Sequence, residues 1–180
     1  GACPLCEGLG STPIEEPKGP SEAICTACDG SRLGPIGRSV RLLGMSLPEL
    51  HACTVKVAKE TLQTLPVDEV TSVLKEELTR RLEVLDELGL SYLSLDRAAH
   101  TLSTGELQRV RIAAVCGARL CGVLYVFDEP SAGLHPTDLP RLVNVLERLR
   151  REGNTLLVVD HDPVLIQAGE HVIDFGPEAG

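Results

Sequence analysis

The chain has 180 residues, of which 43% are hydrophobic and 24% are charged. This is enough for one compact domain with a small satellite, or for two small domains, and it excludes a disordered tail, a collagen and a long coiled coil. Seventeen basic residues against twenty-six acidic ones give a formal net charge of −9. A dedicated basic nucleic-acid binder is therefore not expected, and any contact with DNA has to come from a local patch.

The chain begins with Gly rather than Met, so we expect it to be a piece of a longer protein. No charged segment precedes an apolar run as in a secretory signal. No stretch reaches the roughly 18 apolar residues of a membrane helix. We expect a cytoplasmic protein without a membrane partner.

Residues 1–41 are rich in Gly, Pro and Cys and cannot build a sizeable apolar core alone. They contain two CxxC pairs, Cys3 with Cys6 and Cys25 with Cys28, and residues 7–24 lie between the pairs. This spacing is typical of a tetrahedral Zn²⁺ site with four thiolate ligands and no open position, which is a structural site. Two disulfides are the alternative, which the missing secretory signal disfavours.

Three further cysteines, Cys53, Cys116 and Cys121, lack a partner motif. We expect them to be small buried hydrophobic residues.

Residues 42–100 are acidic and predict helices. Apolar residues recur at helical spacing over 70–88, and Gly89 is a plausible C-cap. From residue 101 on, strand and helix patterns alternate, with strands expected at 122–128, 155–159 and 171–175. Thr137 or Asp138 could cap the helix that precedes the second strand. This alternation predicts an α/β fold with a parallel sheet covered by helices.

A polar turn at 101–109 opens a helix whose expected apolar face contains Leu107, Val110, Ala113 and Ala114. The hydroxyl of Ser103 and the backbone at Gly105 would lie at the helix N-terminus, where the helix dipole favours anions. Ser103 and Glu106 also fit an ordinary capping box, so this turn alone is a weak sign of a phosphate site.

Carboxylates follow the first expected strand, and a histidine follows the second. Asp128 can hold a Mg²⁺-bound water, Glu129 can polarise an attacking water, and His161 can reach a γ-phosphate. Ligands bind at the carboxyl ends of parallel strands. The alternative is that these residues only cap strands or lie on the surface, but three motifs in order favour phosphoryl transfer.

Together these motifs resemble an ABC-type P-loop ATPase. Leu102–Glu106 is similar to the signature motif, with Thr104 departing from its usual first glycine. Val123–Glu129 is similar to the Walker B strand, Ser131–His135 to the D-loop, and His161 to the switch histidine. No GxxxxGK[ST] loop occurs in the chain. We therefore expect that loop to lie upstream and the chain alone to hydrolyse no ATP.

A zinc module just before an ABC signature narrows the resemblance to the UvrA family of nucleotide excision repair. The segments that carry the resemblance are CPLCEGLG at 3–10, CTACDGSRL at 25–33, LGLSYLSL at 88–95, the run at 123–135, GNT at 153–155 and IDFGP at 173–177. It implies a zinc-binding module at 1–41, a helical signature region at 42–100 and part of one ABC ATPase half at 101–180.

The same resemblance implies ATP, Mg²⁺ and structural Zn²⁺ as cofactors. It implies damaged double-stranded DNA, the other ABC half of the same protein and a second copy of the full-length protein as partners. Asp128, Glu129 and His161 would serve one ATP site, whereas Ser103, Gly105 and Glu106 would serve the nucleotide of the other half. In the first half of typical UvrA proteins, the module that binds UvrB lies between the two CxxC pairs, whereas here only eighteen residues, 7–24, separate them. The resemblance therefore implies a UvrA-type protein that lacks this module, or else a piece of the second half. We do not expect UvrB to bind through this region.

The stretch 30–41 contains Arg32, Arg38 and Arg41 and no acidic residue. These arginines could contact DNA phosphates, or they could be solvated side chains near acidic neighbours. Arg109 and Arg111, after the signature turn, could be structural or could face phosphate. The histidines other than His161 are expected to be ordinary surface or core residues.

Three alternatives remain open from the sequence. An ABC ATPase of transport or translation would lack the two CxxC pairs. A zinc-stabilised interaction module on a degenerate ATPase half would not hydrolyse ATP. A UvrA paralogue that serves drug self-resistance rather than general repair is permitted by the short segment between the CxxC pairs.

Overall fold

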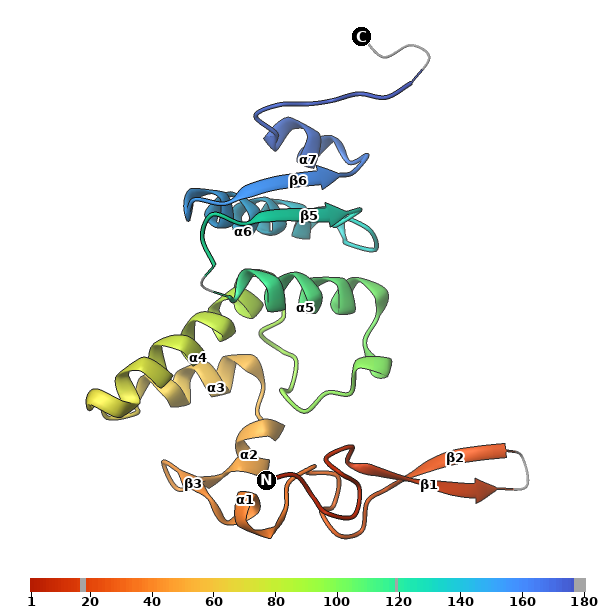
Figure 1. Cartoon of the computed structure of the whole chain (residues 1–180), viewed down its shortest axis with the longest axis vertical. Helices are drawn as coiled ribbons and strands as arrows, with labels where there is room; N and C mark the ends of the chain where they lie inside the picture. The colour runs from red at the N-terminus through yellow and green to blue at the C-terminus, as the bar shows by residue number, and fades with distance from the viewer. Residues whose placement is uncertain (17–18, 119, 177–180) are drawn as a thin grey trace. The chain divides into compact units, whose positions relative to one another are not determined.

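The computed structural model describes residues 1–16, 19–118 and 120–176 (Figure 1). The chain divides into two compact units. The first contains Gly1–Leu65 and Leu93–Arg97, and the second contains Pro66–Tyr92 and Ala98–Gly180. The division into a zinc-binding module at 1–41, a helical signature region at 42–100 and part of an ABC ATPase half at 101–180 stays a prediction.

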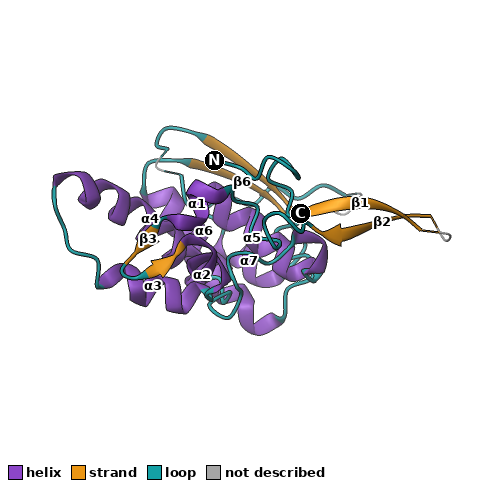
Figure 2. Cartoon of the chain, turned by 90° about the horizontal axis from the view of Figure 1, so that it is seen from below, coloured by secondary structure: helices purple, strands orange, loops and turns teal. Residues whose placement is uncertain are grey.

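The first unit begins with the cysteine-rich turns and an antiparallel hairpin (Figure 2). The hairpin strands are β1 (Ser11–Glu16) and β2 (Gly19–Ile24). The elements that follow are α1 (Pro35–Ser39), β3 (Arg41–Leu42), β4 (Met45–Ser46), α2 (Leu47–Ala52) and α3 (Val55–Gln63). The hairpin region has its own small core, which consists of the four CxxC cysteines.

The second unit begins with α4 (Glu69–Glu87), a helix that ends at the predicted glycine. Gly89 has a φ of +76°, a left-handed conformation that only glycine adopts at little cost. The N–H of Leu90 then donates to the carbonyl of Leu85 at 2.9 Å. This closing bond is typical of a helix C-terminus, and the predicted cap is confirmed.

A parallel pair of strands forms the sheet of the second unit. β5 (Leu124–Asp128) pairs with β6 (Thr155–Val159), so that Asp128 lies opposite Val159. The other elements of the unit are η1 (Ala99–Thr101), α5 (Thr104–Cys116), η2 (Pro136–Asp138), α6 (Leu139–Arg151) and α7 (Pro163–Ala168). The predicted α/β class is confirmed, and β6 has the predicted bounds.

Side chains alternate strictly across this sheet. Tyr125 and Phe127 are buried, with ring centroids 6.2 Å apart, and contribute to a core with α4, α5, α6 and α7. On the opposite face Leu124 and Val126 are exposed, as are Leu157 and Val159 of β6. Parallel sheets are normally covered on both faces, so this apolar face is unusual.

The prediction of a third strand at 171–175 is wrong. No ladder hydrogen bond pairs this segment with another described strand, and its apolar residues Val172, Ile173 and Phe175 are exposed. An apolar run forms a strand only where its backbone can form hydrogen bonds with the edge strand of a sheet. The first strand also starts two residues later than expected, because Gly122 has a φ of +71° and cannot continue a strand.

Two expectations about the helices are corrected. Asp138 precedes α6, but its carboxylate makes no capping bond, since it binds arginines instead. The buried face of α5 consists of Gly105, Ile112, Ala113 and Cys116. Of the residues expected there only Ala113 is buried, since α4 and α6 set which face α5 presents.

The remaining cysteines also differ from expectation. Cys116 is buried as predicted, and its burial raises the pKa of the thiol to about 11. Cys53 is half-buried and Cys121 is exposed, so the prediction is wrong for these two. Among the described residues, no helix is long and apolar enough to cross a membrane.

Candidate functional site

The carboxyl edge of the parallel pair gathers the predicted catalytic residues. The N–H of Glu129 donates to the carbonyl of Val159 at 2.8 Å, which keeps the two strands paired to the point where both end. His161 follows two residues after Val159. The side chains of Asp128, Glu129 and His161 are all exposed, so a ligand at this edge can reach them.

The chain turns sharply directly after β5. Glu129 has a φ of +44°, in the left-handed region that non-glycine residues rarely adopt. Strained backbone of this kind is often found at functional sites, where the surrounding structure maintains it. Here the bond from Glu129 to β6 holds the strained residue in place.

Asp160 is a residue of this edge whose role the sequence did not reveal. Its side chain is only 2% exposed. Its carboxylate accepts hydrogen bonds from the Ser131 N–H at 3.0 Å and from the Ser131 hydroxyl at 2.7 Å. It also accepts from the N–H groups of His161 at 2.8 Å and Asp162 at 2.9 Å.

The protonation of Asp160 follows from these contacts. Burial alone would raise the pKa of the carboxyl, but the hydrogen bonds from Ser131, Asp162 and His161 outweigh it and lower the pKa below the usual range. Asp160 is therefore a charged acceptor that connects the end of β6 to the turn after β5. The only sequence signal for this role of Asp160 was its position directly before His161.

The turn after β5, which contains Ser131 and Gly133, also contacts the N-terminus of α5. A Cβ atom built on Gly105 would lie 2.3 Å from the carbonyl oxygen of Gly133. Any side chain at residue 105 would therefore force the two segments apart. The sequence predicts that the Gly105 backbone lies at a helix N-terminus that favours anions. The structure adds a separate reason for glycine at this position, which is the close contact with Gly133.

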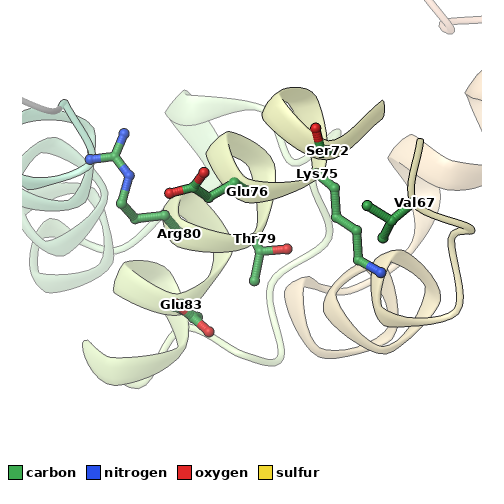
Figure 3. Close-up of a pocket in the computed structure, with 7 residues that line it drawn as sticks. All are labelled: Val67, Ser72, Lys75, Glu76, Thr79, Arg80 and Glu83. Carbon is green, nitrogen blue, oxygen red and sulfur yellow. The ribbon is translucent and has the colours of Figure 1, made fainter. Parts of the chain in front are cut away.

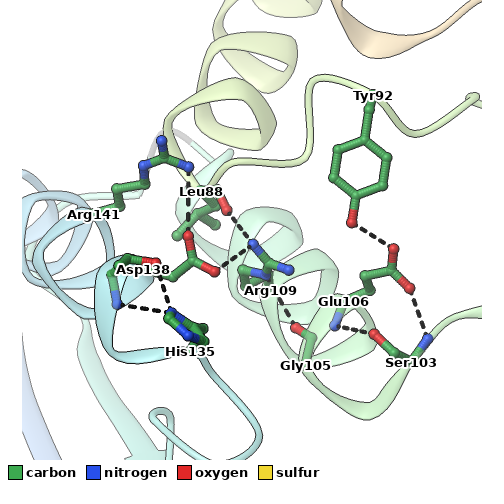
Figure 4. A network of polar contacts seen from close by, with 10 residues as sticks. Leu88, Tyr92, Ser103, Gly105, Glu106, Arg109, His135, Asp138 and Arg141 are labelled. Atoms are coloured by element: carbon green, nitrogen blue, oxygen red, sulfur yellow. Dashed lines mark hydrogen bonds and ion pairs between the residues drawn. The ribbon is translucent and has the colours of Figure 1, made fainter.

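The N-terminus of α5 has the capping box that the sequence allowed. The Glu106 N–H donates to the Ser103 hydroxyl at 3.3 Å, and the Ser103 N–H donates to the Glu106 carboxylate at 2.8 Å (Figure 4). The Tyr92 hydroxyl donates to the other carboxylate oxygen at 2.5 Å, which raises the pKa of Tyr92. The phosphate role of this turn stays a prediction.

Arg109 connects three segments of the second unit, as Figure 4 shows. Its guanidinium donates to the carbonyl of Leu88 at 3.1 Å and to the carboxylate of Asp138 at 3.2 Å, and its Nε donates to the carbonyl of Gly105 at 3.3 Å. The side chain is 12% exposed. Of the two roles left open by the sequence, these contacts favour the structural one.

In the first unit, the four CxxC cysteines form a buried cluster. Their sulfurs all lie within 4.8 Å of one another, with 4.0 Å between Cys3 and Cys25 and 3.7 Å between Cys6 and Cys28. Zn–S bonds of about 2.3 Å in a tetrahedron place sulfurs about 3.8 Å apart. Disulfide sulfurs would be about 2.05 Å apart, so the cluster is compatible with a four-coordinate metal site and not with disulfides.

The backbone supports negative charge in this cluster. The N–H of Gly10 donates to the sulfur of Cys6 at 3.2 Å. Burial alone would raise the pKa of Cys6, but the N–H groups of Gly10 and Gly8 outweigh it and lower the pKa to about 6. Burial instead raises the pKa of Cys28 to about 11. A divalent cation would stabilise all four thiolates together.

The three arginines proposed to contact DNA have different surroundings. Arg41 pairs with Glu49 at 3.2 Å, an acidic residue outside the stretch considered in the sequence. Arg38 is half-buried, and Arg32 is exposed in a left-handed backbone conformation. Their contact with DNA stays a prediction.

A shallow hollow lies along α4 (Figure 3). Val67, Lys75, Thr79 and Glu83 are among the residues that line it. It contains none of the predicted site residues, and its lining mixes opposite charges.

Comparison with known proteins shows which families the chain resembles. A family model described as "AAA domain, putative AbiEii toxin, Type IV TA system" matches residues 68–167. The UvrABC system protein A of Thermus thermophilus is 46% identical over 162 residues, and that of Treponema pallidum is 45% identical over 164 residues. These alignments cover 87% and 89% of this chain, and 17% of each relative.

A solved structure gives the same result. The crystal structure of UvrA2 from Deinococcus radiodurans matches with a TM-score of 0.73 and 32% identity, over 93% of this chain and 20% of that one. The chain thus spans about a fifth of the length of these relatives. It belongs to the AAA domain family over residues 68–167 and, over about nine tenths of its length, to the UvrA family of ABC-type ATPases.

Proposed function

We propose that this chain is the part of a DNA-damage-recognition ATPase of nucleotide excision repair that carries the signature, Walker B, D-loop and switch-histidine residues of one ABC half. The observation that supports this most is the common sheet edge of Asp128, Glu129 and His161 in a chain 45% identical to a UvrABC system protein A. The phosphate-binding loop of this site would lie elsewhere in the complete protein.

In this proposal each residue at the sheet edge has one role. Asp128 would hold a water of the bound Mg²⁺, Glu129 would orient and polarise the attacking water, and His161 would contact the γ-phosphate. The metal would neutralise charge on the phosphates. Ser103, Gly105 and Glu106 would contact the nucleotide of the other half.

The cysteine cluster would hold a structural Zn²⁺. Cys3, Cys6, Cys25 and Cys28 are buried and leave no open coordination position for substrate. Zinc would then fix the backbone next to Arg32, one of the three arginines that could contact damaged double-stranded DNA. The complete protein would work as a dimer, and UvrB would not bind through this region.

Glu129→Gln in the complete protein tests the proposal. The amide keeps the size of the side chain but cannot polarise water, so we expect ATP turnover to fall by roughly 100-fold or more, while ATP still binds. Turnover and nucleotide binding are measured side by side. Glu152→Gln, the same change at an exposed residue of the same unit, is the control.

Two results would contradict the proposal. One is full turnover in Glu129→Gln. The other is an equal loss in both variants, which would indicate a general effect of charge rather than a role in catalysis.

A further inference from the structure

The turn that follows β5 is attached at both of its ends. At one end Ser131 gives two hydrogen bonds to the Asp160 carboxylate, at 2.7 and 3.0 Å. At the other end Gly133 contacts Gly105 so closely that a side chain at Gly105 has no room. The turn therefore joins the end of β6 to the N-terminus of α5.

These two attachments connect two different groups of predicted site residues. Asp160 directly precedes His161, and its carboxylate also accepts the His161 N–H. Gly105 lies in the first turn of α5, between Ser103 and Glu106. A displacement of the turn after β5 would therefore move residues at the carboxyl edge of β5 and β6. It would also move the turn at the start of α5, called the signature turn below.

Asp160 is suited to hold this connection. Its carboxylate is 2% exposed and accepts four hydrogen bonds, three from backbone N–H groups and one from a hydroxyl. Charge-assisted bonds of this kind are shorter and stronger than neutral ones. The bonds give the turn a single position relative to β6.

We propose that Asp160 is a positioning residue that, through Ser131 and the contact between Gly133 and Gly105, fixes the signature turn relative to Glu129 and His161. Asp160 itself contacts neither nucleotide. The proposal rests on the ATPase function proposed above. It adds that the residues of one ATP site and the signature residues of the other are coupled within this single chain.

Asp160→Asn in the complete protein tests this coupling. The new amide group replaces an acceptor of the Ser131 N–H by a donor, so the turn loses its fixed position. We expect faster hydrogen exchange in two separate segments, 129–135 and 103–107. We expect kcat for ATP to fall by roughly 10-fold or more with KM nearly unchanged, because misplacement by about 1 Å can cost up to about 100-fold in rate.

Two further variants make the test specific. Ser131→Ala removes one of the bonds, so it should show the same pattern more weakly, and the double variant should be no worse than Asp160→Asn alone. Asp174→Asn makes the same chemical change at an exposed residue of the same unit and should change neither segment. Circular dichroism shows whether each variant folds, and if Asp160→Asn does not, Ser131→Ala carries the test.

Three outcomes would overturn the proposal: unchanged exchange in both segments, faster exchange confined to 129–135, or effects of Asp160→Asn and Ser131→Ala that multiply. Hydrogen exchange does not depend on catalysis. If Glu129→Gln leaves turnover intact, the proposed function fails, whereas the coupling is decided by exchange alone.

Discussion

At the scale of single residues, buried polar contacts decide what the exposed residues can do. Asp160 and Arg109 are both largely buried, and each joins segments far apart in the sequence. Asp128, Glu129 and His161 are exposed and depend on such contacts for their positions. The motifs of the sequence pointed to these exposed residues as the predicted site. The sequence did not reveal the supporting contacts, because the partners of a buried charge depend on the fold.

Gly105 gives a residue-scale prediction. Gly105→Ala would place a methyl group 2.3 Å from the carbonyl oxygen of Gly133, so the turn and the helix must separate. We expect the free energy of unfolding of the chain to fall by about 1–3 kcal/mol, as is typical of overpacking. Chemical denaturation measures this fall.

Gly176→Ala is the matched control, because nothing lies within 4 Å of a Cβ atom built there. It should leave stability unchanged. If Gly105→Ala is as stable as Gly176→Ala, the close contact between Gly105 and Gly133 does not exist in solution.

At the scale of elements, sequence patterns predicted the structure correctly where nearby residues alone determine the local conformation. The CxxC spacing led to a compact cysteine cluster, Gly89 ends α4, and β6 has its predicted bounds. Prediction failed at 171–175, where an apolar run has no strand to pair with among the described residues. It also failed for the buried face of α5, which neighbouring helices determine.

The hairpin of β1 and β2 belongs to a region whose core is the cysteine cluster. If zinc replaces an apolar core there, a strong chelator should unfold residues 1–41 and leave β5 and β6 protected, since structural zinc contributes on the order of 10 kcal/mol. Hydrogen exchange with and without chelator measures both regions.

Cys25→Ser should reproduce the effect of the chelator and lower the zinc content, measured as metal bound per chain. Cys121→Ser, at an exposed cysteine outside the cluster, should not. Full protection of residues 1–41 in chelator would contradict a structural metal.

At the scale of the whole molecule, the sheet of the second unit has one covered face and one exposed face. Leu124, Val126, Leu157 and Val159 expose apolar side chains on the uncovered face. Exposed apolar patches of this kind mark interaction surfaces or cause aggregation. The chain spans about 17% of its curated relatives, in which further segments are available to cover such a face.

We therefore expect the 180-residue chain alone to bind a hydrophobic dye such as ANS and to self-associate. Val126→Lys should reduce both, because it places a charge on the exposed face. Val73→Lys, at an exposed valine of α4, is the control. Equal dye binding by the two variants would show that the sheet face is not the exposed patch.

We expect Glu129 and His161 to act in one hydrolytic site at the carboxyl edge of β5 and β6. The most direct test measures ATP turnover of the complete protein with Glu129→Gln, with His161→Ala and with both changes. Residues of one catalytic unit are strongly non-additive, so we predict that the double variant is about as slow as the slower single variant. Losses that multiply, or a single variant with full turnover, would contradict the account.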